Sequence, residues 1–305
     1  MPFTLIKGTF QVVSYSPDGD SIRFHPGDPN LIRGLLNGDR AKLNMRGDVQ
    51  LRIEAIDTLE THFTPPSGGS PSLHQPVDLA RAATDALLEF VGIADVAWDQ
   101  QRRNVVSAAD GTPGYILARS VERNGRPVAF VYAGDADEAD GADVFLDSAR
   151  LRASYNYTAT SSGLAYATFY KGLFSDLRDE LASAASAARA AGKGVYAEDG
   201  SQVGFNATNL GVITDEVPIM PKLFRRLSDY MVSSGSAVGF TSTLEAAREP
   251  VLDLTTSNFT HFDTLIEQAD GSTTIKLTRF PESLVFDETI PQPGPVFAAV
   301  MDAMR

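Results

Sequence analysis

Residues 51–60 read Leu51-Arg52-Ile53-Glu54-Ala55-Ile56-Asp57-Thr58-Leu59-Glu60. Apolar residues alternate with other residues over the first half, which predicts a β-strand that runs out at Asp57-Thr58. Arg52 lies five residues before Asp57, and Glu60 lies three residues after it. Because a rigid sheet positions the side chains just past a strand end, cations and phosphates are often bound at such places.

Residues 9–24 predict a β-hairpin upstream of this strand. Its two runs are joined by Ser16-Pro17-Asp18-Gly19, in which Pro-Asp-Gly is a strong turn signal. Asp20 is then the first residue of the returning strand, where it is placed to meet a carboxylate from a neighbouring strand end. The alternative is that Asp18 and Asp20 are only turn residues, since Asp is common in turns.

A second hairpin turn is predicted at Asn124-Gly125. It puts Arg126 at the mouth of the strand that follows, residues 128–132. Helical spacing of apolar residues predicts helices over 77–91 and 173–191. The loop 133–143 is rich in acidic residues but does not match the spacing of a helix-flanked calcium loop, so we interpret it as a solvated loop.

The order of elements predicts an α+β fold. Five or more short strands with turn signals, followed by helices, favour a small five-stranded Greek-key barrel of the OB type over residues 1–203. Residues 204–305 predict a small α/β accessory domain with a helix at 221–232, a strand at 273–279, and further short elements at 284–286 and 296–304. We find no chemical motif in this second part.

Composition narrows the classes of function. The chain has 305 residues, 43% of them hydrophobic, and no cysteine, which excludes disulfides and thiolate chemistry. The formal net charge of −13 argues against a non-specific nucleic-acid coat, although not against an enzyme that contacts phosphate through a few local arginines. The sequence shows no signal peptide and no apolar run long enough for a membrane span, so we expect a cytoplasmic protein without membrane contact.

The segment 61–76 is rich in Pro, Ser and Gly, which predicts a mobile surface loop. His62 and His74 flank it. They are candidate metal ligands or phosphate contacts, but isolated histidines are more often incidental.

Taken together, Asp18-Gly19-Asp20, the motif Arg-x4-Asp-Thr-x-Glu at 52–60, and Gly125-Arg126 resemble the signature of the staphylococcal nuclease (thermonuclease) family. Members of that family are calcium-dependent phosphodiesterases built on an OB-type barrel. The resemblance covers about residues 8–200, with insertions at 25–49, 61–76 and around 133–160.

The resemblance implies a Ca²⁺ site. Asp20 and Asp57 match the two carboxylates that ligate calcium, the backbone carbonyl of Thr58 matches the third protein ligand, and Asp18 matches a nearby acidic residue outside the ligand set. These oxygen donors suit a hard cation such as calcium.

The resemblance also implies catalytic roles. Arg52 and Arg126 match the two guanidinium groups that grip the scissile phosphate, where planar forks of donors suit phosphate oxygens. Glu60 matches the residue that orients or deprotonates the attacking water. The residue types alone leave open whether Glu60 is a general base or an electrostatic positioner.

The sequence departs from the family pattern at several places. Leu59 stands where the family usually has proline, and Asn124 stands where the type member has a tyrosine at the nucleotide site. Tyr166 and Tyr170 resemble the later tyrosines that line the nucleotide site in the type member. The acidic surface also differs from the basic type member.

Three functions remain as hypotheses. The first is a calcium-dependent nuclease that cleaves DNA, RNA or both, as single-stranded or flexible nucleic acid, and leaves 3′-phosphate ends as the family does. The second is a non-catalytic OB-fold module that binds nucleic acid or protein. In the third, Arg52–Asp57 and Arg126–Glu60 are structural ion pairs without chemistry.

Overall fold

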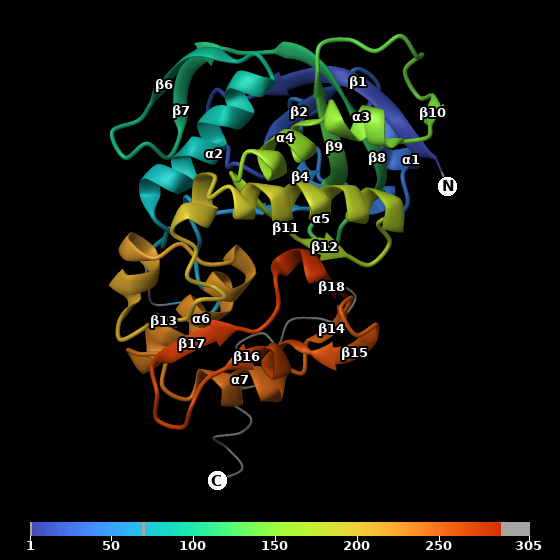
Figure 1. The fold of residues 1–305 in the computed structure, drawn as a ribbon. Helices are drawn as coiled ribbons and strands as arrows, with labels where there is room; N and C mark the ends of the chain where they lie inside the picture. The colour runs from blue at the N-terminus through green and yellow to red at the C-terminus, as the bar shows by residue number, and fades with distance from the viewer. Residues whose placement is uncertain (1, 69–70, 288–305) are drawn as a thin grey trace.

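The computed structural model describes residues 2–68 and 71–287 and shows a mixed α+β fold (Figure 1). Its main sheet has seven strands: β1 (Phe3–Gln11), β2 (Arg23–Pro26), β3 (Val49–Gln50), β4 (Arg52–Ile53), β8 (Thr112–Val121), β9 (Pro127–Ala133) and β10 (Asp143–Val144). The order in space is β3-β2-β1-β8-β9-β4, with β10 paired to β1. All pairs are antiparallel except β4 with β9.

The sheet curls into a nearly closed barrel because its two outer strands, β3 and β4, are consecutive in the chain and separated only by Leu51. Two backbone bonds help the closure: Leu51 N donates to Ile22 O at 2.8 Å, and Ile53 N donates to Asp20 O at 2.9 Å. Leu51 and Ile53 are fully buried in the apolar interior of the barrel.

The single strand expected over residues 51–57 is interrupted. After β4 the backbone of Ala55 takes a positive φ of 65°, and the chain restarts as β5 (Ile56–Thr58). β5 leaves the barrel and pairs with β11 (Ala165–Ala167) instead. The alternating pattern correctly predicted extended backbone. It gave no indication of the kink at Ala55, which places Asp57 on a second sheet.

The first hairpin also differs from the prediction. Its returning strand begins at Arg23 rather than at Asp20, and the turn closes through a bridge between Asp18 and Ser21. The second hairpin is as predicted: Gly125 turns with a φ of 88° between β8 and β9. A Cβ atom at this glycine would lie 2.6 Å from the carbonyl oxygen of Arg40, so a larger residue would not fit.

Helices cover one side of the barrel. The predicted helices are present as α2 (Val77–Phe90) and α5 (Ser175–Ala190). In Figure 1, α5 crosses the middle of the molecule, with the barrel above it and the C-terminal part of the chain below. Shorter helices are α1 (Pro29–Gly34), α3 (Ser148–Arg152) and α4 (Tyr155–Ser161), and a hairpin of β6 (Ala94–Trp98) and β7 (Val105–Ala109) extends beside α2.

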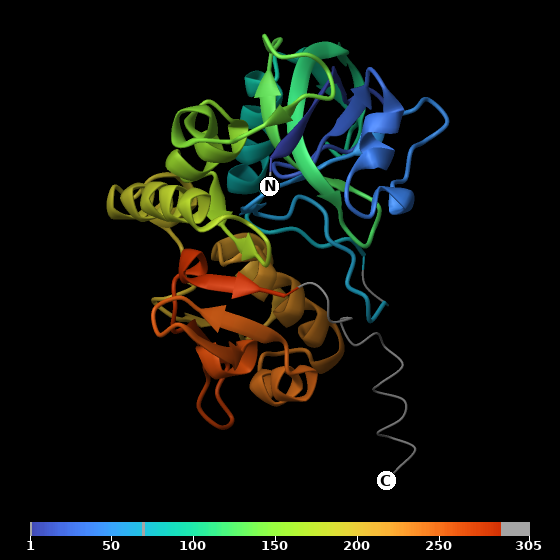
Figure 2. The same cartoon turned by 90° about the vertical axis from the view of Figure 1, so that its right-hand side faces the viewer.

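The C-terminal part contains α6 (Pro221–Ser234) and α7 (Phe240–Ala247), with strands on two small sheets (Figure 2). One sheet has the order β12-β18-β14-β15 and the other β13-β17-β16. The strands are β12 (Phe169–Tyr170), β13 (Phe205–Asn206), β14 (Pro250–Asp253), β15 (Asn258–His261), β16 (Ile266–Glu267), β17 (Thr274–Leu277) and β18 (Leu284–Phe286). The elements expected at 221–232, 273–279 and 284–286 are therefore present, whereas 296–304 lies outside the described residues.

The two parts of the chain share one apolar cluster. Leu59, Ala80 and Tyr166 from the first part are buried in it together with Phe224 and other residues of the C-terminal part. The division near residue 203 stays a prediction, since side chains from both sides of it fill the same core. Within the described residues, none of the helices is both long and apolar enough to cross a bilayer.

Candidate catalytic and metal site

The two carboxylates expected to bind calcium approach each other where β5 leaves the barrel. Asp57 lies in β5 opposite Tyr166 of β11, and both Asp57 and Thr58 are buried. Asp20 lies in the turn before β2, where its own carbonyl oxygen accepts the Ile53 N–H. Thr58 N points to the Asp20 carboxylate at 3.4 Å, so Asp20 and the Asp57-Thr58 pair adjoin.

An arginine from the C-terminal part reaches into this acidic group. On α6, Arg225 donates from both terminal nitrogens to Asp57, at 3.0 Å to Oδ1 and 2.7 Å to Oδ2. The same guanidinium also donates to Glu60 Oε1. Only 26% of the Arg225 side chain is exposed, against 7% for Asp57 and 14% for Glu60. Arg225 therefore bridges an expected metal ligand and the expected water-activating residue.

The pKa values of these carboxyl groups are raised because several of them are buried close together. Burial and the neighbouring Asp57 raise the pKa of Asp20 to about 6, although Arg225, Arg126 and Arg52 act to lower it. Burial likewise raises the pKa of Glu60 to about 7, against the opposing charge of Arg225. Burial, Asp20 and Glu60 raise the pKa of Asp18 well above its usual range. Additional positive charge here would relieve this repulsion.

The two arginines expected to grip phosphate lie within electrostatic range of the acids. The charges of Arg126 and Arg52 both act on Asp20. Arg126 is a third exposed and donates from Nε to Glu122 at 3.2 Å. The Arg52 guanidinium lies over the ring of Tyr170, 4.2 Å from its centroid. The ion-pair hypothesis therefore named the wrong partner for Glu60, which pairs with Arg225 rather than with Arg126.

The tyrosines divide between core and surface. Tyr166 is fully buried, its ring meets that of Tyr196 edge-on at 5.6 Å, and its hydroxyl group donates to Asp199. It is therefore a core residue in this structure rather than one that a substrate reaches. Tyr170 is half-buried and faces Arg52, so only this tyrosine lies beside the arginine of the expected site.

The sequence did not reveal two residues that complete the site. Arg225 belongs to an amphipathic helix, and nothing in its local pattern distinguishes it from Arg226, which pairs with Glu249 instead. Gln75 is fully buried, accepts from Glu60 N at 3.3 Å and donates to Ile219 O at 2.7 Å. It fixes the backbone of Glu60 to the C-terminal part, and it comes from a segment interpreted only as a loop.

The donor set suits a hard divalent cation. In residues 2–68 and 71–287, no three His, Asp or Glu side chains are grouped as ligands for one ion, and the expected set has two carboxylates and a carbonyl. Thr58 Oγ1 is buried and has no hydrogen-bond partner, and the adjoining carboxylates repel each other. An oxygen-lined place with excess negative charge is what calcium prefers. Asp20, Asp57 and Thr58 would hold the ion.

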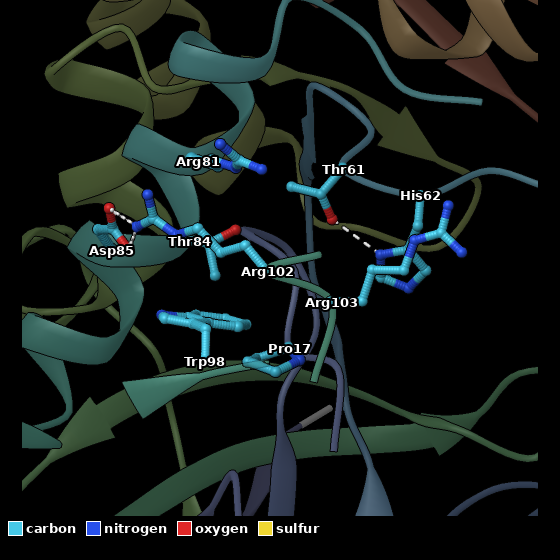
Figure 3. A pocket seen from close by; sticks show the side chains of 9 residues that line it. All are labelled: Pro17, Thr61, His62, Arg81, Thr84, Asp85, Trp98, Arg102 and Arg103. Atoms are coloured by element: carbon cyan, nitrogen blue, oxygen red, sulfur yellow. Dashed lines mark hydrogen bonds and ion pairs between the residues drawn. The ribbon is translucent and has the colours of Figure 1, made fainter. Parts of the chain in front are cut away.

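A small basic pocket adjoins the acids on the side of Thr61 (Figure 3). His62 lies at its edge, with Nδ1 at 2.8 Å from Thr61 Oγ1 and at 4.0 Å from the Asp18 carboxylate. Arg102 donates from one terminal nitrogen to both carboxylate oxygens of Asp85, at 2.9 and 2.7 Å. Arg81 and Arg103 also line the pocket, and neither side chain forms a hydrogen bond or ion pair within the described ranges.

A larger groove of about 1000 Å³ shares no lining residue with this pocket and is lined in part by the half-buried Arg52 and Tyr170. Several further basic residues line it: Arg40, Arg119, Arg123 and Lys171. Acidic residues are also present, and Lys171 pairs with Asp287 at 3.6 Å. A groove rich in arginine is unexpected on a protein with a net charge of −13, and it starts at a residue of the expected site.

No family model matches the sequence, and no curated protein is similar enough to count as a relative. The functional conclusions therefore depend on the residues and geometry described above.

Proposed function

We propose that this protein is a calcium-dependent phosphodiesterase that cleaves nucleic acid, with an OB-type barrel of the staphylococcal nuclease kind. One observation carries the proposal: Asp20, from the first hairpin, adjoins Asp57 and Glu60 of a later segment at one buried site, which also lies within electrostatic range of Arg52 and Arg126. Buried carboxylates with perturbed pKa values and local arginines are typical of catalytic sites.

Each group has a role in such a reaction. Arg52 and Arg126 would hold the non-bridging oxygens of the scissile phosphate and stabilise the charge that develops there. Glu60 would orient the attacking water and accept its proton. A bound calcium ion would polarise a phosphoryl oxygen and help to orient the water. The expected product has a 3′-phosphate end.

The flanking surfaces support a polymeric substrate. The groove beside Arg52 is lined by three further arginines and a lysine, which offer contacts to successive phosphates. On the other flank, Arg81 and Arg103 are available to phosphates. These local features fit single-stranded or flexible DNA or RNA better than they fit a single small phosphate ester.

One observation favours the second candidate, a non-catalytic binding module. Arg225 occupies both oxygens of Asp57 and one oxygen of Glu60, and these are the atoms that catalysis requires. In a module of this kind the barrel and its basic groove would bind nucleic acid while Arg225 replaces the metal.

Cleavage of a labelled single-stranded DNA oligonucleotide distinguishes the two candidates. We expect cleavage in calcium, none in chelator, and a loss of roughly 100-fold or more in Arg126→Ala, which removes one donor to the phosphate. Arg248→Ala, an exposed arginine at the end of α7, is the matched control and should cleave like the unmodified protein. Oligonucleotide binding without cleavage at any calcium concentration would support the module.

A further inference from the structure

We infer that Arg225 is a built-in competitor of the divalent cation, through which the C-terminal part of the chain sets how tightly the site binds calcium. This inference rests on the proposed function, because it concerns the regulation of the same site.

The competition follows from the atoms that Arg225 contacts. Its two terminal nitrogens hold both oxygens of Asp57, at 3.0 and 2.7 Å, and one of them also reaches Glu60. Two-donor arginine–carboxylate pairs are among the stronger hydrogen-bonded pairs in proteins. An ion that binds Asp57 must share these oxygens with the guanidinium or displace it. In addition, the positive charge of Arg225 repels a cation at contact distance from the same carboxylate.

The charge of Arg225 is permanent. Burial alone would lower the pKa of Arg225, but Asp57 and Glu60 outweigh burial and raise it well above its usual range. The competitor is thus present at every pH at which the protein is folded, and only movement of the side chain removes it.

The backbone that carries Arg225 is fixed. Phe224, the preceding residue, is fully buried, and its ring meets Phe63 at 6.1 Å. Because α6 belongs to the shared apolar cluster, we exclude opening of the whole C-terminal part as the way to release Asp57. The side chain itself is 26% exposed, so rotation of its own bonds is the available movement.

The competing arginine also lies within electrostatic range of one residue of the groove. The electrostatic neighbours of Arg225 include Tyr170, which lines the groove together with Arg52. A phosphate group of a nucleic acid bound there would be an alternative partner for the guanidinium, since arginine binds phosphate and carboxylate with the same fork of donors. Substrate binding would then draw Arg225 off Asp57 and tighten calcium binding.

Calorimetric titration with calcium at pH 8 tests the inference without relying on cleavage. Arg225→Gln removes the charge and the two-donor pair, and we expect it to bind calcium roughly 10- to 100-fold more tightly than the unmodified protein. Arg248→Gln removes an exposed arginine from the same part of the chain and should bind calcium like the unmodified protein. In cleavage assays, Arg225→Gln should reach half its maximal rate at a lower calcium concentration.

The outcomes separate this inference from the proposed function. Equal or weaker calcium binding by a folded Arg225→Gln would overturn the inference, whatever the cleavage result. Tighter binding without cleavage by either protein would uphold the competition and remove the nuclease proposal. Should the glutamine variant not fold, Arg225→Lys keeps one charge but offers no planar fork. Its calcium-induced rise in melting temperature should then exceed that of the unmodified protein, and an equal or smaller rise would overturn the inference.

Discussion

Replacement of Glu60 by glutamine is the sharpest test of the proposed chemistry. The amide keeps the size of the side chain and can still accept a hydrogen bond from Arg225, so the fold and the position of α6 should be retained. What the variant lacks is the charge and the ability to take a proton from water. We therefore expect Glu60→Gln to fold and to bind nucleic acid, but to cleave far more slowly.

The size of the loss follows from the role assigned to the group. A positioned general base contributes roughly 100- to 10,000-fold to a rate, which corresponds to about 3–5 kcal/mol of transition-state stabilisation. The geometry favours the full effect, because Glu60 is only 14% exposed and its backbone is fixed by Gln75. Bulk water thus has limited access to replace it as proton acceptor.

Single-turnover cleavage of a labelled single-stranded oligonucleotide at saturating calcium measures the loss. Glu245→Gln, an exposed carboxylate on α7, is the control and should leave the rate unchanged. If Glu60→Gln cleaves within about threefold of the unmodified protein, Glu60 is not the proton acceptor and the proposed mechanism is wrong.

Three further results are expected. Glu249 is buried against two cationic partners, so Glu249→Ala should lower the free energy of unfolding by about 3–5 kcal/mol in urea titrations. Burial acts to raise the pKa of Glu249, but Lys222 and Arg226 lower it below the ordinary glutamate value of 4.5. The stability that this carboxylate adds is therefore complete above that pH and is lost as the pH falls through the lower pKa of the folded state. Arg81→Gln combined with Arg103→Gln should weaken binding to single-stranded DNA and make it less salt-dependent, with a slope reduced by about 0.7 per lost phosphate contact, as measured by fluorescence anisotropy. Tyr155→Phe removes the single hydroxyl proton that the carbonyl oxygens of Gly19 and Ala83 share, and it should cost about 1–3 kcal/mol of stability by the same titration.

Much of the fold could be predicted because the relevant signals are local. The turn at Asn124-Gly125 and the apolar spacing of α2 and α5 each depend on a few neighbouring residues, and these elements are present. The kink at Ala55 could not be predicted in this way. Alanine has no preference for positive φ, so the kink is imposed by the separate pairing of β4 with β9 and of β5 with β11.

The candidate site shows the same limit. Asp20, Asp57 and Glu60 were selected as motif residues, and the structure brings them together. Arg225 follows them by more than 160 positions. Whether Arg225 or the adjacent Arg226 pairs with Asp57 and Glu60 depends on which face of the helix is turned toward them. That orientation is set by burial of Phe224 in the shared core, a long-range packing effect that a single sequence does not display.

The parallel pairing of β12 with β18 has a practical consequence for anyone who wishes to dissect this protein. A truncation after residue 203 would strip β12 of its neighbour and leave Leu59, Ala80 and Tyr166 facing solvent. Such a fragment would expose an unpaired strand edge next to an apolar surface, and this combination promotes aggregation. Biochemistry on this barrel therefore calls for the intact polypeptide, with point substitutions in place of deletions.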